Sequence, residues 1–169
     1  MKKLLLAFTV LLISASSIQA QTGIPEAKAK FIYNFTKFFE WPQSSQSGDF
    51  VIGVLGSNDV YQALEDFTKG KKVILKDIKV NRFTSIENVS NCHILFVSRN
   101  HSKSLPDLDK RLGSNTLLIS NSKKGIKRGA ALNFLLKGNR LKYEFAASNA
   151  TDKGLKFSSR IKDMAAKNY

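Results

Sequence analysis

Three short segments of the chain are continuously apolar, and each ends in small or polar residues. They span residues 50–55, 92–97 and 116–119. Unbroken apolar runs of this length are typical of parallel strands that are buried on both faces of a sheet. Segments with helical spacing separate them, which indicates an α/β fold. We expect a three-layer sandwich, with a mainly parallel central sheet and helices on both faces.

Residues 25–40 carry the strongest helical pattern. Pro25 suits the first turn of a helix, and Pro42 predicts that the helix ends at Trp41. Such a helix can pack its apolar face on the sheet, or dock it on a membrane or a partner, and the pattern leaves both interpretations open. The apolar positions recur at steps of three and four: Ala27, Phe31, Phe35 and Phe38, widened by Ile32 and Phe39.

The remaining elements follow from weaker patterns. Gly138-Asn139 is a hairpin turn signal between two apolar runs, so we expect an antiparallel hairpin near the C-terminus. Residues 73–80 read as a strand with poor alternation. Two hairpin strands are expected over residues 131–136 and 141–145. The other predicted elements are helices over residues 58–69 and 103–112, and a helical C-terminal part from Ser148 that breaks near Gly154 and resumes over residues 158–167.

The first twenty residues have the three parts of a secretory signal peptide. Two lysines precede an apolar run from Leu4 to Ile13, and small and polar residues follow up to Ala20. This run is shorter than the roughly 20 residues needed to cross a bilayer. We expect cleavage after Ala20, which would leave residues 21–169 as a single domain in the periplasm.

The chain is strongly basic, with a formal net charge of +14. Removing residues 1–20 would leave 25 basic and 13 acidic residues, a net charge of +12. Such a charge suits an anionic membrane, an acidic partner or a solvated surface. The lysines are scattered and the chain is expected to be exported, so we do not expect nucleic acid as a partner.

Candidate catalytic chemistry is sparse. Cys92 is the single cysteine, which excludes a disulfide within one chain, and a buried structural thiol is the expected role. Cys92 and His93 are neighbours on a strand and point to opposite faces, so they cannot form a dyad. No nucleophile elbow, zinc pair or phosphate loop is present. We expect no catalytic residue, metal or cofactor; His93 is a core residue or a ligand contact, and a hydrolase using His93 is a lesser alternative.

The ends of the three apolar strands are the candidate ligand site. If the strands are parallel, these ends lie along one edge of the sheet, where open α/β sheets bind ligands. The same residue types are also what turns and helix caps require, so the pattern leaves both readings open. The expected ligand-binding residues are Gly56, Ser57, Ser98, Arg99, Ser120 and Asn121.

Five segments, in order along the chain, resemble the YfiR family of small exported bacterial proteins. The most specific are Phe35–Pro42, within the segment over residues 30–42, and Cys92–Phe96, within the segment over residues 92–97. The others cover residues 52–56, 129–134 and 154–160 together with 164–165, so the resemblance extends over most of the chain.

The resemblance implies an α/β sandwich, often dimeric, and a non-enzymatic periplasmic regulator. Such a regulator binds and restrains the periplasmic domain of a membrane-bound diguanylate cyclase, which links the envelope to cyclic-di-GMP signalling and biofilm. A stand-alone periplasmic protein that binds a small ligand is the alternative.

The chain departs from the family pattern at three places. Ala130 stands where a second glycine is expected, and Phe145-Ala146 replaces an Ile-Asn pair. Cys92 lacks the cysteine partners that other members have. The departures argue against a redox-sensing role and against any contact that the missing Asn would make, and they do not affect the expected fold.

Overall fold

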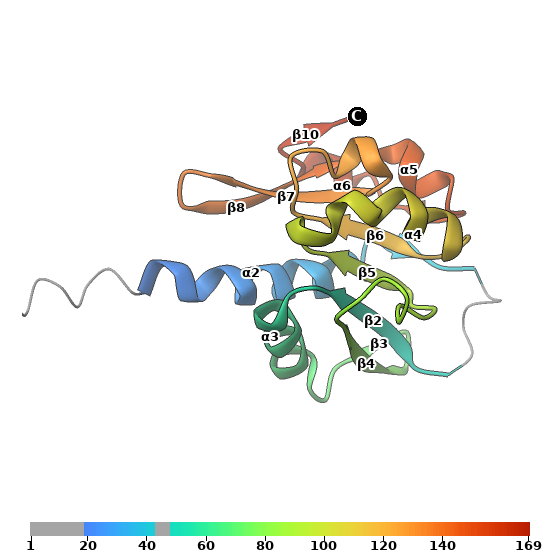
Figure 1. The fold of residues 1–169 in the computed structure, drawn as a ribbon, viewed down its shortest axis with the longest axis horizontal. Coiled ribbons are helices and arrows are strands. Elements are labelled where there is room, and N and C mark those ends of the chain that lie inside the picture. Colours follow the sequence, from blue (N-terminus) through green and yellow to red (C-terminus); the bar gives the residue numbers. More distant parts are fainter. Residues whose placement is uncertain (1–18, 43–47) are drawn as a thin grey trace, which may run out of the picture.

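The computed structural model describes residues 19–42 and 48–169, so nearly all of the expected signal peptide lies outside the described residues. Figure 1 shows a central sheet with helices packed around it. The elements are α2 (Gln19–Phe35), β1 (Phe39–Glu40), β2 (Phe50–Leu55), α3 (Asn58–Thr68), β3 (Lys72–Val73), β4 (Lys76–Phe83), β5 (Ile94–Val97), η3 (Arg99–Ser104), α4 (Leu105–Arg111), β6 (Leu117–Ser120), η4 (Ile126–Arg128), β7 (Leu132–Lys137), β8 (Arg140–Phe145), α5 (Ala147–Thr151), β9 (Lys156–Phe157), α6 (Arg160–Asp163) and β10 (Lys167–Asn168).

Eight strands form one sheet in the order β10-β8-β7-β6-β5-β2-β4-β3. Its centre, from β4 to β7, is parallel throughout. Towards its two ends, β8 runs antiparallel to β7 and β3 runs antiparallel to β4. The predicted α/β class is therefore confirmed, but the sheet is mixed, and the expected parallel character holds for its centre. The predicted hairpin around Gly138-Asn139 is the β7–β8 pair.

The strand order reverses beside β2. From β2 the chain passes through α3 to β4 on one side, and then crosses to β5 on the other side. The carboxyl ends of β2 and β5 therefore flank a topological switch point, the position at which open α/β sheets bind ligands.

Each face of the sheet is covered by a separate apolar cluster. On one face, Ile32 and Phe35 of α2 and Leu64 of α3 pack with Ile94 and Phe96. On the other face, Leu105 and Leu108 of α4 pack with Leu95, Val97 and Leu118. The strand residues alternate between the two clusters, as expected for strands buried on both sides. Helices thus cover both faces, although the second cover is short.

The helix expected over residues 25–40 has different ends. It begins at Gln19, so Pro25 lies inside it, and it ends at Phe35. Thr36 Oγ1 and the Phe38 amide then donate to carbonyls of the last turn, at 2.6 and 2.9 Å. Phe39 leaves the helix to pair with Phe157 of β9. That partner is distant in sequence, so the local periodicity of residues 25–40 could not reveal it.

The helix expected over residues 158–167 is wrong beyond its first turn. After α6, the Ala166 amide donates to the Tyr143 carbonyl at 2.8 Å, and β10 joins the edge of β8. The strand expected over residues 73–80 is likewise divided. Ile74 and Leu75 both have positive φ, of 48° and 67°, and form the tight turn between β3 and β4.

The aromatic face of α2 packs on the sheet. The Phe35 ring stacks on Phe134 at 6.0 Å and meets Tyr143 edge-on at 5.1 Å. Of the two interpretations of this helix, packing on the sheet is therefore confirmed. Within residues 19–42 and 48–169, no helix combines the length and apolar character needed to cross a bilayer.

Candidate functional site

Parallel register brings the predicted strand ends into one row. Leu55 pairs with Val97, and Val97 pairs with Ser120, across β2, β5 and β6. Gly56, Ser98 and Asn121 each follow one of these three residues. All the predicted ligand residues therefore lie at the carboxyl edge of the sheet.

The β2 part of this edge is filled by its own side chains. Gly56 has a φ of 76°, and a Cβ atom there would lie 2.1 Å from Nδ1 of His101 and 2.6 Å from Oγ of Ser98. These two atoms lie 3.3 Å apart. Ser57 caps α3, since its Oγ accepts from the Val60 amide at 3.4 Å. Gly56 thus forms the turn and Ser57 caps the helix. These contacts agree with the interpretation that small and polar residues follow the strand because turns and helix caps require them.

The β6 part of the edge buries polar atoms that have no partner. Ser120 is completely buried and Ser122 is 5% exposed. Within the described part of the chain, the hydroxyl oxygens of both serines and Oδ1 of Asn121 lack a hydrogen-bond partner. Buried polar atoms are almost always paired, with protein, water or a ligand, so this cluster needs an explanation.

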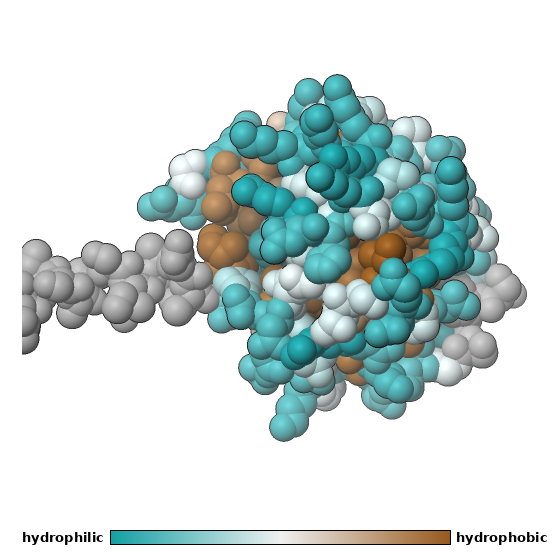
Figure 2. All heavy atoms as spheres, viewed as in Figure 1, coloured by the Kyte–Doolittle hydropathy of each residue, from teal (hydrophilic) through white to brown (hydrophobic). Residues whose placement is uncertain are grey.

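An open pocket of about 430 Å³ lies beside these residues. We call it the strand-end pocket. Its apolar wall contains Phe134 and Leu141, and the surface next to the start of α2 and the β7–β8 hairpin is hydrophobic (Figure 2). Its polar side comprises Lys28, Arg99, Asn121, Ser122, Lys123, Asn133 and Glu144.

Lys28 reaches this pocket from α2. Its Nζ lies 5.5 Å from the centre of the Phe96 ring. Burial, and then the nearby positive charge of Arg99, lower the pKa of Lys28, while Asp59 opposes this shift. The ammonium group is therefore held in surroundings that disfavour its positive charge, and a bound anion would relieve this.

Asn133 and Glu144 form a fixed polar pair in the pocket. The Asn133 side chain accepts from the Ser122 amide at 3.1 Å and donates to Glu144 at 2.9 Å. The hydroxyl of Tyr169 also donates to Glu144, at 3.0 Å. The polar groups of both side chains are therefore occupied by the protein itself.

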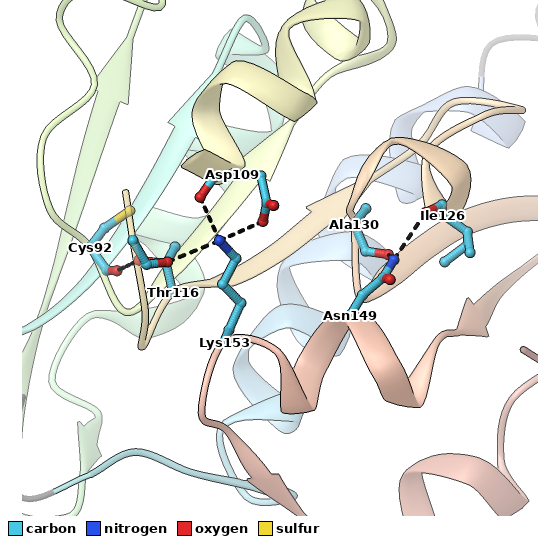
Figure 3. Close-up of polar contacts among 8 residues, drawn as sticks. Cys92, Asp109, Thr116, Ile126, Ala130, Asn149 and Lys153 are labelled. Carbon is cyan, nitrogen blue, oxygen red and sulfur yellow. Dashed lines mark hydrogen bonds and ion pairs between the residues drawn. The ribbon is translucent and has the colours of Figure 1, made fainter. Parts of the chain in front are cut away.

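The connection between β6 and β7 is clamped from α5. Asn149 Nδ2 donates to the carbonyls of Ile126 and Ala130, both at 2.9 Å (Figure 3). Ala130, which replaces the expected glycine, is completely buried in the second apolar cluster. The clamp fixes the segment that carries Ser122 and the lysines after it.

Cys92 and His93 lie at the opposite, amino end of β5. Burial raises the pKa of the Cys92 thiol to about 12, which confirms a buried structural thiol. His93 Nδ1 accepts from the Val51 amide at 3.0 Å, and the ring stacks on Phe50 at 4.5 Å. These contacts join strands and agree with a core role for His93.

Sequence reasoning included Arg99, Ser120 and Asn121 but missed Lys28, Ser122, Lys123 and Asn133. The sequence pattern could have indicated two of these residues. Asn133 interrupts an apolar strand, and Ser122 extends the polar run that begins at Ser120. Lys28 carried no such signal, because only the packing of α2 on the sheet brings it to this edge.

No three His, Cys, Asp or Glu side chains in the described ranges gather as a metal site. The sequence profile of the YfiR/HmsC-like family matches residues 25–166. No curated protein matches the chain.

Proposed function

Because the chain belongs to the YfiR/HmsC-like family, we propose that it is a non-enzymatic periplasmic regulator that binds and restrains the periplasmic domain of a membrane-bound diguanylate cyclase. The family is one of regulators in cyclic-di-GMP signalling, generally without enzymatic activity. The observation that carries the proposal is the extent of the family match, which covers residues 25–166 and so nearly the whole described fold.

The charge of the chain supports reversible association with an acidic partner. With residues 1–20 removed, 25 basic residues face 13 acidic ones. Long-range attraction of this kind speeds encounter, and salt weakens it. The aromatic face of α2 is unavailable for docking, since Ile32 and Phe35 are buried against the sheet. We therefore propose a partner surface elsewhere on the molecule, and a homodimer stays part of the proposal.

The switch in this role would be a small ligand at the carboxyl edge of the sheet. Gly56, Ser57 and Ser98 form the packed side of the proposed site, whereas Arg99 and Asn121 line the strand-end pocket and Ser120 lies buried next to Asn121 in the chain. Such a ligand regulates only if it binds the partner-competent and incompetent states unequally. The pocket also supports the second candidate function, a stand-alone ligand-binding protein. The described contacts of His93 give no support to a hydrolase.

The proposal is tested in the native bacterium. Tagged chain is recovered from detergent-solubilised envelope, and cyclic-di-GMP is measured in a deletion strain. We expect a membrane cyclase in the pull-down and a raised nucleotide level on deletion. The full chain should restore the level, whereas a control chain that lacks residues 2–20 should not. An unchanged nucleotide level, with no membrane partner recovered, would contradict the regulator role.

A further inference from the structure

A second, smaller recess of about 280 Å³ adjoins the strand-end pocket and shares Arg99, Ser122 and Lys123 with it. We call it the basic recess. Four cationic side chains and two serines line it, and no acidic side chain does: Arg99, Ser102, Ser122, Lys123, Lys124 and Arg128.

No ion pair among the described residues neutralises the cations of the recess. In the described part of the chain the ion pairs join Lys72 to Asp77 and Lys153 to Asp109, so none of the four cations takes part in one. Glu144 lines the strand-end pocket but not the recess. Four neighbouring cations without a counter-charge are most easily accommodated by a ligand with more than one negative charge.

The recess is built from buried groups as well as surface lysines. Ser102 is 4% exposed and Ser122 is 5% exposed. Ser102 Oγ donates to the Arg99 carbonyl at 2.8 Å and accepts from Arg128 Nη1 at 3.0 Å. Arg128 is thus held in place while most of its five N–H groups remain available. The Ser122 hydroxyl, buried and without a partner, supplies a further donor.

We infer that the basic recess binds a small phosphate group, either inorganic phosphate or the head of a phosphomonoester. Guanidinium groups match phosphate oxygens with paired N–H donors, and hydroxyls complete the coordination. The adjoining strand-end pocket, with its apolar wall, has room for the organic part of an ester. The recess shares Arg99 with the ligand site of the proposed function, but the test of phosphate binding does not depend on the regulatory role, because it measures the isolated domain.

The test uses residues 21–169 and measures thermal unfolding at constant ionic strength. Inorganic phosphate, glycerol phosphate and sodium chloride are the probes. We expect both phosphates, but not chloride, to raise Tm with a saturable dependence on concentration. The double variant Arg99→Gln/Arg128→Gln should weaken the affinity at least about tenfold, and Ser122→Ala should weaken it several-fold.

The matched control is Arg140→Gln/Arg160→Gln, which removes the same charge from two exposed arginines outside both cavities. It should respond to phosphate like the unaltered chain. Tighter binding of glycerol phosphate than of inorganic phosphate would identify an ester, and the reverse order would identify free phosphate. An equal response to chloride, or an equal loss in both double variants, would overturn the site.

Discussion

Among the described residues, buried polar groups are hydrogen-bonded at the amino ends of the central strands but unpaired at the carboxyl ends. At the amino end, Lys153 Nζ donates to Asp109 Oδ1 at 2.6 Å and to the Gly113 carbonyl at 2.9 Å. Thr116 Oγ1 donates to the Cys92 carbonyl at 2.8 Å (Figure 3). At the carboxyl end, by contrast, Ser120, Asn121 and Ser122 keep buried oxygens without a described partner.

The two ends thus differ in whether their buried polar groups are paired within the described part of the protein. A paired polar group inside the protein contributes to stability, whereas an unpaired one costs free energy. Three adjacent unpaired groups therefore destabilise the folded state unless water or a ligand forms hydrogen bonds with them. Their position at the carboxyl edge is where α/β sheets bind ligands, which is consistent with the ligand site proposed above.

The largest expected effect concerns Cys92 at the amino end. A thiol pKa of about 12, against the ordinary value of 9, leaves about a thousandfold less thiolate in the folded protein near pH 8. Iodoacetamide should therefore label the native chain far more slowly than the chain unfolded in urea. Equal labelling rates in the native and unfolded chain would show that the Cys92 thiol is accessible to solvent in the folded protein.

The same shift makes stability depend on pH. The pKa of Cys92 is higher in the folded state than in the unfolded state. Its contribution to the free energy of unfolding is therefore complete below about pH 9 and declines as the pH rises towards 12. Cys92→Ala should remove this part of the decline, as measured by urea denaturation at several pH values.

Breaking the Lys153 network should have the next largest effect. Lys153→Ala leaves Asp109 and the Gly113 carbonyl without their partner, and we expect a loss of about 3 kcal/mol in the free energy of unfolding. The control is Lys72→Ala, in an exposed pair whose N–O distance is 3.1 Å. It should change stability by less than about 0.5 kcal/mol. Similar losses in the two variants would contradict a structural role for the amino end.

Substitution of Gly56 tests how tightly the carboxyl edge is packed around the end of β2. Gly56→Ala should cost about 2 to 3 kcal/mol, because the new methyl group meets the positive φ and also the His101 ring. Gly70 has a φ of 71° but nothing within 4 Å of an added Cβ. Gly70→Ala should therefore cost about 1 kcal/mol, from the backbone alone. Equal costs in chemical denaturation would show that the His101 contact is not tight.

Substitution of Ser120 should have the smallest effect on the free energy of unfolding. Ser120→Ala removes a buried hydroxyl that has no described partner, so we expect stability to change by less than about 0.5 kcal/mol or to rise. Thr116→Val, which removes a paired hydroxyl at the amino end, should cost about 1 kcal/mol. A larger loss of stability for Ser120→Ala than for Thr116→Val would contradict the view that the Ser120 hydroxyl is unpaired and the Thr116 hydroxyl is paired.

The positions of the strand ends could be predicted where the signal was local, whereas ligand binding at these residues stays a prediction. Continuous apolar runs located β2, β5 and β6, and the polar residues after them located the carboxyl edge. The same pattern did not separate Ser57, which caps α3, from Arg99, which lines a pocket, because turns, caps and ligand sites use the same residue types. Ser102 and Arg128 were missed, since their contact joins residues 26 positions apart.

The sequence by itself determined the α/β class, the buried strands, the hairpin and the family. These follow from hydrophobic period, turn residues and motif order, which are properties of short segments. Tertiary structure decided where α2 ends, because Phe39 pairs with Phe157, and it converted an expected helix into β10 at the edge of β8. It also brought Lys28 to the strand-end pocket and gathered four cations around two buried hydroxyls. Long-range pairing and burial set these features, and neither is encoded in any one segment.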